Sequence, residues 1–145
     1  MREIKLRAWD SKEKEMLYSD KLMDFAQFIC DKTDEGISCY AHRGTEWVDE
    51  GEECGERDIF DKLDNIMQFT GLKDKNGVEI YEGDILRYFE QLVVVEYNND
   101  RFALRWLAKN CYYREDLEYW ATKQKIEVIG NIYQNPELLE QENER

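Results

Sequence analysis

The chain has 145 residues and a formal net charge of −13 at pH 7, from 33 acidic and 20 basic residues. Its length fits a single domain, and a hydrophobic content of 42% is ample for a packed core, which excludes wholesale disorder. A surface this acidic repels nucleic-acid phosphates unless the basic residues gather on one face. The acidity favours solubility, and the alternative is a lure for a basic partner, as in proteins that imitate the DNA backbone.

The sequence also predicts where the protein resides. No apolar run approaches the ~20 residues that a membrane-spanning helix needs. Residues 1–10 are charged and alternating, unlike the apolar stretch of a signal peptide. We therefore expect a cytoplasmic protein with no membrane contact.

The first predicted element is a strand over residues 3–9, where apolar and polar residues alternate with the period of two that a half-buried strand requires. Residues 10–14 form a polar turn and residues 16–18 the return strand, which completes a hairpin.

The stretch after the hairpin has two interpretations. A short helix after Ser19 or Asp20 would place one apolar face at helical spacing, made of Leu22, Phe25, Ala26 and Ile29. Phe28 breaks the polarity of that face, so a strand is the alternative.

Residues 31–61 are acidic and weakly periodic, which predicts an exposed, variable insertion. Residues 38–40 and 46–48 predict a small hairpin within it.

The cysteines and the single histidine are candidate metal ligands. In a reducing cytosol the four cysteines are expected to be thiols. A tetrahedral zinc site could use a set drawn from this part of the chain, namely Cys30, Cys39, His42 and Cys54. Only Cys39 and His42 have a short ligand spacing, and there is no Cys-x2-Cys pair, so the spacing favours unrelated thiols. We predict no metal and no cofactor.

From residue 59 the pattern indicates β-structure. Tight turns at 75–77 and 82–84 separate short runs of β-branched and aromatic residues, and Asn-Gly at 76–77 can reverse a strand in two positions. The predicted strands are residues 66–70, which run into a break at Thr70-Gly71, and then 78–81, 85–90, 92–97, 101–107 and 125–130. Residues 98–100 predict a hairpin turn and residues 112–120 a covering loop or one helical turn. Pro136 predicts the start of a final helical turn.

These elements predict a mainly β fold (β or α+β), in which an N-terminal hairpin region packs with a C-terminal SH3-like barrel. We expect one domain over residues 1–145, made of a hairpin with its insertion (1–62), the barrel (63–135) and a tail (136–145). The apolar residues of its strands give the expected core: Ile85, Leu86, Val93, Val95, Phe102, Leu104, Val128 and Ile132.

Three segments resemble the YopX family of phage and prophage proteins. They read MREIKLRAWD at 1–10, IMQFTGLKDKNGVEIYEGDILRY at 66–88 and EVIGNIYQNPELL at 127–139. The resemblance is weakest over residues 22–61. It implies a barrel-like β half and a bacterial host cell as the setting, and it implies no particular activity.

No catalytic signature is present, because the sequence lacks GxSxG, GxxxxGK[ST], HExxH and EF-hand patterns. Asp74, Glu82 and Asp84 are expected to shape turns rather than to bind a divalent cation. We therefore expect a non-enzymatic phage or prophage accessory protein that binds a host or phage macromolecule, most simply a protein.

A nucleic-acid-binding module is the alternative, because cations and rings mix as they do on single-strand platforms. Its candidate residues are Arg87, Arg101, Arg105, Trp106, Tyr112, Tyr113 and Arg114. Alternation along residues 101–107 places the rings opposite the arginines, which favours an ordinary buried face.

The apolar strand at 92–97 needs cover on both faces, from a second layer of the chain or from a symmetry mate. We expect a homo-oligomer, most simply a dimer. Rings that would add contact area are Trp47, Tyr112, Tyr113 and Trp120.

Overall fold

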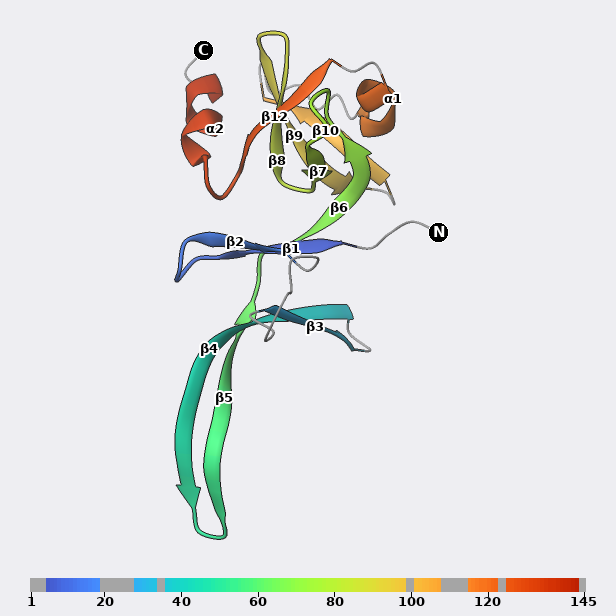
Figure 1. Ribbon diagram of the computed structural model, residues 1–145. Helices are drawn as coiled ribbons and strands as arrows, with labels where there is room; N and C mark the ends of the chain where they lie inside the picture. Colours follow the sequence, from blue (N-terminus) through green and yellow to red (C-terminus); the bar gives the residue numbers. More distant parts are fainter. Residues whose placement is uncertain are drawn as a thin grey trace. The chain divides into compact units, whose positions relative to one another are not determined.

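The computed structural model describes residues 5–18, 28–33, 36–98, 101–107, 115–122 and 125–143. The fold is mainly β, which confirms the predicted class (Figure 1). The chain divides into two compact units at Ile66 and Met67, one of which is Lys5–Ile66. In the described chain neither of the two helices is long and apolar enough to cross a bilayer.

The first unit begins with the predicted hairpin. Strands β1 (Leu6–Asp10) and β2 (Glu15–Tyr18) pair antiparallel. The side chain of Asp10 shapes the turn between them, because its Oδ1 accepts hydrogen bonds from the backbone N–H groups of Lys12 (3.1 Å) and Glu13 (3.4 Å). The predicted polar turn is confirmed.

A three-stranded antiparallel sheet follows, in the order β3 (Phe28–Thr33), β4 (Gly36–Glu50) and β5 (Glu53–Leu63). Ile29 lies in β3, so the strand interpretation is right there and the helical one is wrong; residues 19–27 lie outside the described chain. The core of this unit combines the hairpin and the sheet: Leu6, Ala8, Cys39, Ala41 and Leu63.

The insertion predicted over residues 31–61 is largely exposed at the described side chains of residues 45–58, as expected, but it is not weakly structured, because most of the stretch is strand. The predicted small hairpin is wrong. Residues 38–40 and 46–48 lie on the same strand, and residues 46–48 pair with 55–57 of β5. The sequence does not indicate these strands, because the part of β4 and β5 that pairs only within the hairpin carries charged side chains on both faces. A half-buried strand is recognised by alternation of apolar and polar residues, and that alternation is missing here.

The second unit contains the predicted β-structure. Its first strands are β6 (Ile66–Lys73) and β7 (Glu79–Tyr81), which pair antiparallel. The expected break at Thr70-Gly71 is an irregularity of register within β6 and not its end. Next come β8 (Asp84–Tyr88), β9 (Gln91–Asn98), β10 (Arg101–Trp106), β11 (Glu115–Asp116), α1 (Leu117–Thr122), β12 (Ile126–Asn131) and α2 (Pro136–Asn143).

Five of these strands form an antiparallel sheet in the order β11-β10-β9-β8-β12. The strands predicted at 78–81, 85–90, 92–97, 101–107 and 125–130 are confirmed to within two residues at each end, whereas β6 extends to Lys73, beyond its predicted end. Pro136 is the first residue of α2, as predicted. Residues 99–100 of the expected turn and residues 108–114 lie outside the described chain, and α1 supplies the helical turn expected near Trp120. The arrangement is consistent with an SH3-like barrel.

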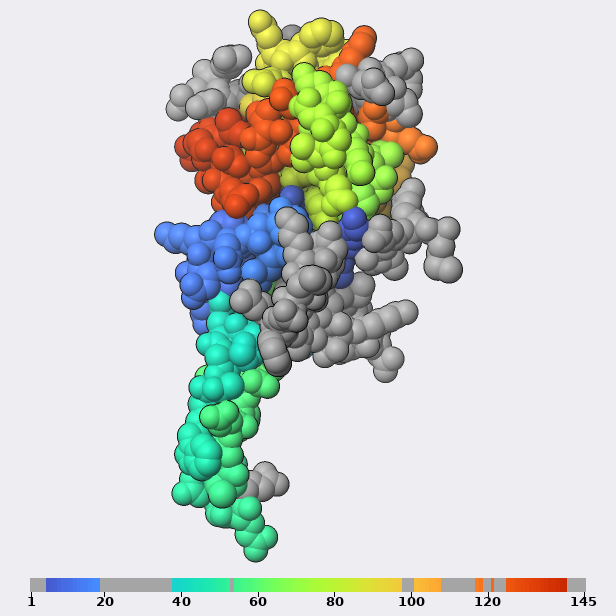
Figure 2. Space-filling model, in the orientation of Figure 1, coloured from blue at the N-terminus to red at the C-terminus, as the bar shows by residue number. Residues whose placement is uncertain are grey.

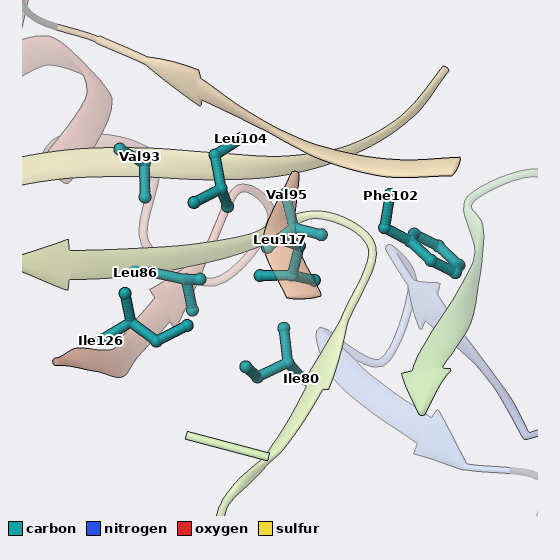
Figure 3. Close-up of a cluster of buried hydrophobic side chains, with 8 residues drawn as sticks. All are labelled: Ile80, Leu86, Val93, Val95, Phe102, Leu104, Leu117 and Ile126. Carbon is teal, nitrogen blue, oxygen red and sulfur yellow. The ribbon is translucent and has the colours of Figure 1, made fainter. Parts of the chain in front are cut away.

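Strand β9 lies at the centre of this sheet and is covered on both faces by its own chain. On one face, eight buried side chains converge (Figure 3): Ile80, Leu86, Val93, Val95, Phe102, Leu104, Leu117 and Ile126. On the other, Leu92 and Val94 pack with Ile85, and Leu138 and Leu139 of α2 lie against them. The second-layer alternative is therefore the right one for this strand. Six of the eight predicted core residues are buried, and Val128 and Ile132 are half-buried against the same clusters.

Two aspartates of the signature segment 66–88 hold the backbone of this unit. Asp74 Oδ1 accepts hydrogen bonds from the N–H groups of Asn76 (2.8 Å) and Val78 (2.9 Å), and its Oδ2 accepts one from Val128 (2.9 Å). Asp84 Oδ2 accepts one from the N–H of Tyr81 (2.8 Å). Both aspartates are turn residues, as predicted.

Gly83 in the same region cannot readily be replaced. Its φ is +84°, and a Cβ there would lie 3.0 Å from the sulfur of Met67. The signature residues described above therefore serve the fold, and they indicate no ligand.

Candidate protein-binding arm

The hairpin of β4 and β5 extends beyond the sheet that supports it (Figure 1). Strand β3 pairs with β4 only as far as Ala41. Beyond a register shift at His42–Gly44, residues 45–58 of β4 and β5 pair only with each other within the described chain. We call residues 45–58 the arm. It is the narrow teal and green projection in Figure 2.

The arm contributes nothing to the core of its unit. Among its described side chains, all are exposed except for Val48, which is half-exposed, and none belongs to a buried cluster. A two-stranded hairpin without a core is only marginally stable in water. The arm is therefore an appendage to the fold.

The arm is strongly acidic. Seven carboxylate residues stand against one cation, Arg57, which gives a net charge of −6 for residues 45–58. The acidic residues are Glu46, Asp49, Glu50, Glu52, Glu53, Glu56 and Asp58.

The register assigns the arm's side chains to two faces, because directly opposed residues of an antiparallel pair point to the same side. Trp47 is opposite Glu56, and the same face carries Asp49 and Asp58. The indole of Trp47 is 69% exposed, which is more than any other aromatic ring among the described side chains of this unit. On the other face Arg57 Nη2 forms an ion pair with Glu46 Oε1 at 2.6 Å. The exposed ring and the arm's one cation thus lie on opposite faces.

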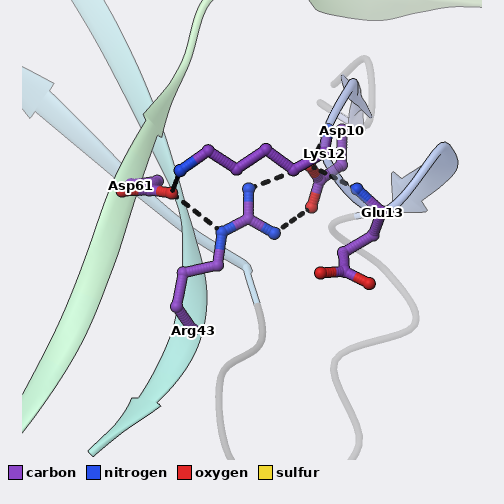
Figure 4. A network of polar contacts seen from close by, with 5 residues as sticks. All are labelled: Asp10, Lys12, Glu13, Arg43 and Asp61. Carbon is purple, nitrogen blue, oxygen red and sulfur yellow. Dashed lines mark hydrogen bonds and ion pairs between the residues drawn. The ribbon is translucent and has the colours of Figure 1, made fainter. Parts of the chain in front are cut away.

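An ion-pair network fixes the root of the arm. Arg43 is the extra residue of the register shift, next to Gly44, whose φ is +121°. Its guanidinium donates two hydrogen bonds to Asp10, from Nη1 (2.5 Å) and Nη2 (2.9 Å), and one from Nε to Asp61 (3.0 Å) (Figure 4). Lys12 Nζ reaches the same Asp61 carboxylate at 2.5 Å. The network joins the β1–β2 turn to the first residues of the arm's hairpin.

The neighbouring cations lower the pKa values of both carboxyl groups, Asp10 and Asp61. The hydrogen bond from Arg43 lowers the pKa of Asp10, against the opposing effect of burial, since Asp10 is only 2% exposed. The hydrogen bonds from Lys12 and then from Arg43 lower the pKa of Asp61. A hollow of about 200 Å³ beside the network is lined by Asp10, Glu13, Glu15, Leu17, Ala41, His42 and Arg43. Both carboxylates therefore stay charged at neutral pH and keep their ion pairs with Arg43 and Lys12.

The zinc candidates do not converge. Cys39 is buried and disulfide-bonded, so the expectation of a thiol is wrong for this residue; Cys30 occupies the opposing backbone position in β3. Cys54 is exposed near the arm's tip, whereas His42 is opposite Phe60. Six residues of strand separate positions 54 and 60, which is roughly 20 Å. Cys111 lies outside the described chain.

The described chain contains no group of three or more His, Cys, Asp or Glu residues placed to hold a metal ion. His42 instead contacts the ring of Phe60, at 5.2 Å between centroids, and Asp58 Oδ1, at 3.1 Å from its Nε2.

The nucleic-acid candidates are dispersed or paired. Arg87 Nη2 lies 3.0 Å from Glu127 Oε2, and Arg105 forms an ion pair with Glu96. Trp106 is half-buried and packs edge-on against Tyr88 beside the core. Arg101 is exposed, whereas Tyr112, Tyr113 and Arg114 lie outside the described chain. The carboxylates reduce the positive charge that Arg87 and Arg105 could offer to phosphates.

Sequence reasoning missed the arm and its root. A signal for the arm was present, since Glu46 and Arg57 have opposite charges and are equally distant from Gly51-Glu52. The root has no local signal, because Arg43 and Asp10 are 33 positions apart.

Comparison with known proteins confirms the resemblance seen in the sequence. A family model described as YopX protein matches residues 5–140, a range that includes the arm. The chain is also similar to a solved protein, EF1440 from Enterococcus faecalis, with 30% sequence identity and a TM-score of 0.58. The match covers 96% of this chain and 99% of that one. No curated protein matches.

Proposed function

The chain belongs to the YopX protein family, and on this premise we propose that it is a non-enzymatic accessory protein of a phage or prophage, which binds a host or phage protein through the arm. The observation that carries the proposal is a two-stranded arm that adds no core residue and displays an exposed tryptophan.

The energetics of the arm support this proposal. Ordering the backbone costs about 1–2 kcal/mol per residue, and this cost is normally offset by burial. Residues 45–58 bury almost nothing within their own unit, although an ion-pair network holds their root in place. Tryptophan is among the residues that most often dominate the binding energy of protein interfaces. Trp47 therefore fits the role of an anchor in a partner's pocket.

The charge of the arm indicates the partner's chemistry. A segment with a net charge of −6 attracts a basic protein surface and accelerates encounter with it. The same charge repels nucleic acid, which supports a protein partner over the nucleic-acid alternative. The absence of catalytic motifs from the sequence supports a binding role. Cytoplasmic residence and homo-oligomer formation remain predictions.

Replacing Trp47 by serine tests the proposal. We expect tagged W47S chain to recover the partner from bacterial lysate much less well than the wild type, because truncating a dominant interface residue costs about 2 kcal/mol, or about thirtyfold in affinity. The measurement is quantitative affinity capture at equal amounts of folded bait.

The matched control for this test is Phe89→Ser, which removes an equally prominent ring, 70% exposed, from the other unit. Recovery by this control should equal that of the wild type. Equal recovery by W47S would instead remove the arm from the proposed interface.

A further inference from the structure

Within the described chain, the part of β4 that lies in the arm has one unpaired strand edge, on the side where β3 pairs nearer the root of the arm. Strand β3 pairs with β4 from Gly36 to Ala41, and within the described chain no strand continues that pairing beside residues 45–50. An unpaired strand edge presents rows of N–H and C=O groups that can accept another strand. The register shift lies below this segment, at His42–Gly44, so residues 45–50 are regular strand.

The charge on this edge decides which strand it can accept. A second copy of the arm would bring two segments of net charge −6 together, and like charges on adjacent strands are destabilising. A basic strand would place opposite charges across the new ladder, which is favourable. The charge therefore disfavours pairing of this edge with a second copy of the arm and favours pairing with a basic segment.

The alternation of β4 sets the pattern of that segment. Glu46 and Glu50 lie on one face with Val48, and Trp47 lies on the other with Asp49. An extended segment that alternates basic and apolar residues would place its cations beside Glu46 and Glu50 and its apolar groups beside the indole of Trp47. Backbone hydrogen bonds would provide affinity and the alternate side chains would provide specificity, as in other strand-addition complexes.

We propose that residues 45–50 of β4 bind an extended basic segment of the partner protein by strand addition. This inference rests on the proposed function and specifies how the arm makes its contact. The new strand would lie beside β4 in line with β3.

A synthetic peptide of alternating lysine and valine is the probe. We expect it to bind the full chain, as measured by fluorescence anisotropy of the labelled peptide, and to slow hydrogen exchange of the backbone amides at 45–50. The matched control carries the same charge and sequence but is N-methylated at its two central residues, which removes an N–H donor from each edge of the peptide. It should bind about tenfold more weakly.

Two results would overturn strand addition. The first is binding of the N-methylated peptide within about twofold of its parent, which would show that charge alone accounts for the affinity. The second is the absence of parent binding or of protection at residues 45–50. Either result leaves the proposed function standing if W47S still loses the partner, so the failure of the two ideas can be told apart.

Discussion

Replacing Val95 by aspartate is expected to unfold the unit that begins at Met67. Val95 is 1% exposed on the central strand β9 and lies among the converging side chains of the main core. A carboxylate there loses its hydration without gaining a partner, at a cost of several kcal/mol, which is a large part of the ~5–15 kcal/mol that stabilises a domain. Denaturant unfolding followed by circular dichroism measures the loss.

The control is Gln91→Asp, which places the same charge at an exposed position of the same strand. Its unfolding midpoint should stay close to that of the wild type. A V95D midpoint equal to that of the control would mean that the side chain of Val95 does not face the core.

Replacing Arg43 by methionine should have the second largest effect. The substitution keeps most of the side chain's bulk but removes the three hydrogen bonds to Asp10 and Asp61. Asp10 is then left buried without its cation. We expect the free energy of unfolding to fall by about 2 kcal/mol, between the values for exposed and fully buried ion pairs. Arg57→Met is the matched control, because its ion pair with Glu46 is exposed, and it should change stability by less than about 0.5 kcal/mol.

The difference in stability between the wild type and the Arg43→Met variant should also depend on pH. The pKa of Asp10 in the folded chain lies below its ordinary value of 3.8, chiefly because Arg43 donates hydrogen bonds to it. The stabilisation is therefore complete above pH 3.8 and is lost as the pH falls through the folded pKa. The stability difference between wild type and R43M should shrink on acidification below pH 3.8. A difference that stays constant or grows there would exclude this ion pair as its source.

The strands of the second unit were predictable because their signals are local. Alternation marks strands such as Arg101–Trp106, and tight turns such as the one at Asn76-Gly77 separate them. Phe102 and Leu104 are buried as the alternation indicated.

The arm was not predictable by the same reasoning. The period of two identifies a strand only where one face is apolar, and residues 45–58 carry charge on both faces. The root was hidden for a different reason, because Asp10 and Asp61 approach Arg43 from distant parts of the chain.

The family resemblance could not indicate the function either, for a physical reason. Signature residues such as Asp74, Gly83 and Asp84 hold turns and strands in place. They specify the scaffold, whereas the arm lies outside the three signature segments at 1–10, 66–88 and 127–139. A signature of this kind identifies the fold and does not indicate what the protein binds.

Removal of the arm shows whether this hairpin is the part of the chain that binds the partner. Residues 45–58 can be replaced by Asn-Gly between Gly44 and Ile59, which are already paired across the hairpin. We expect the free energy of unfolding of this shortened chain to lie within about 0.5 kcal/mol of the wild-type value, because the arm buries no core residue. We also expect the shortened chain to recover none of the partner that the intact chain captures. Recovery of the same partner in the same amount by the shortened, folded chain would show that the partner binds elsewhere on the protein.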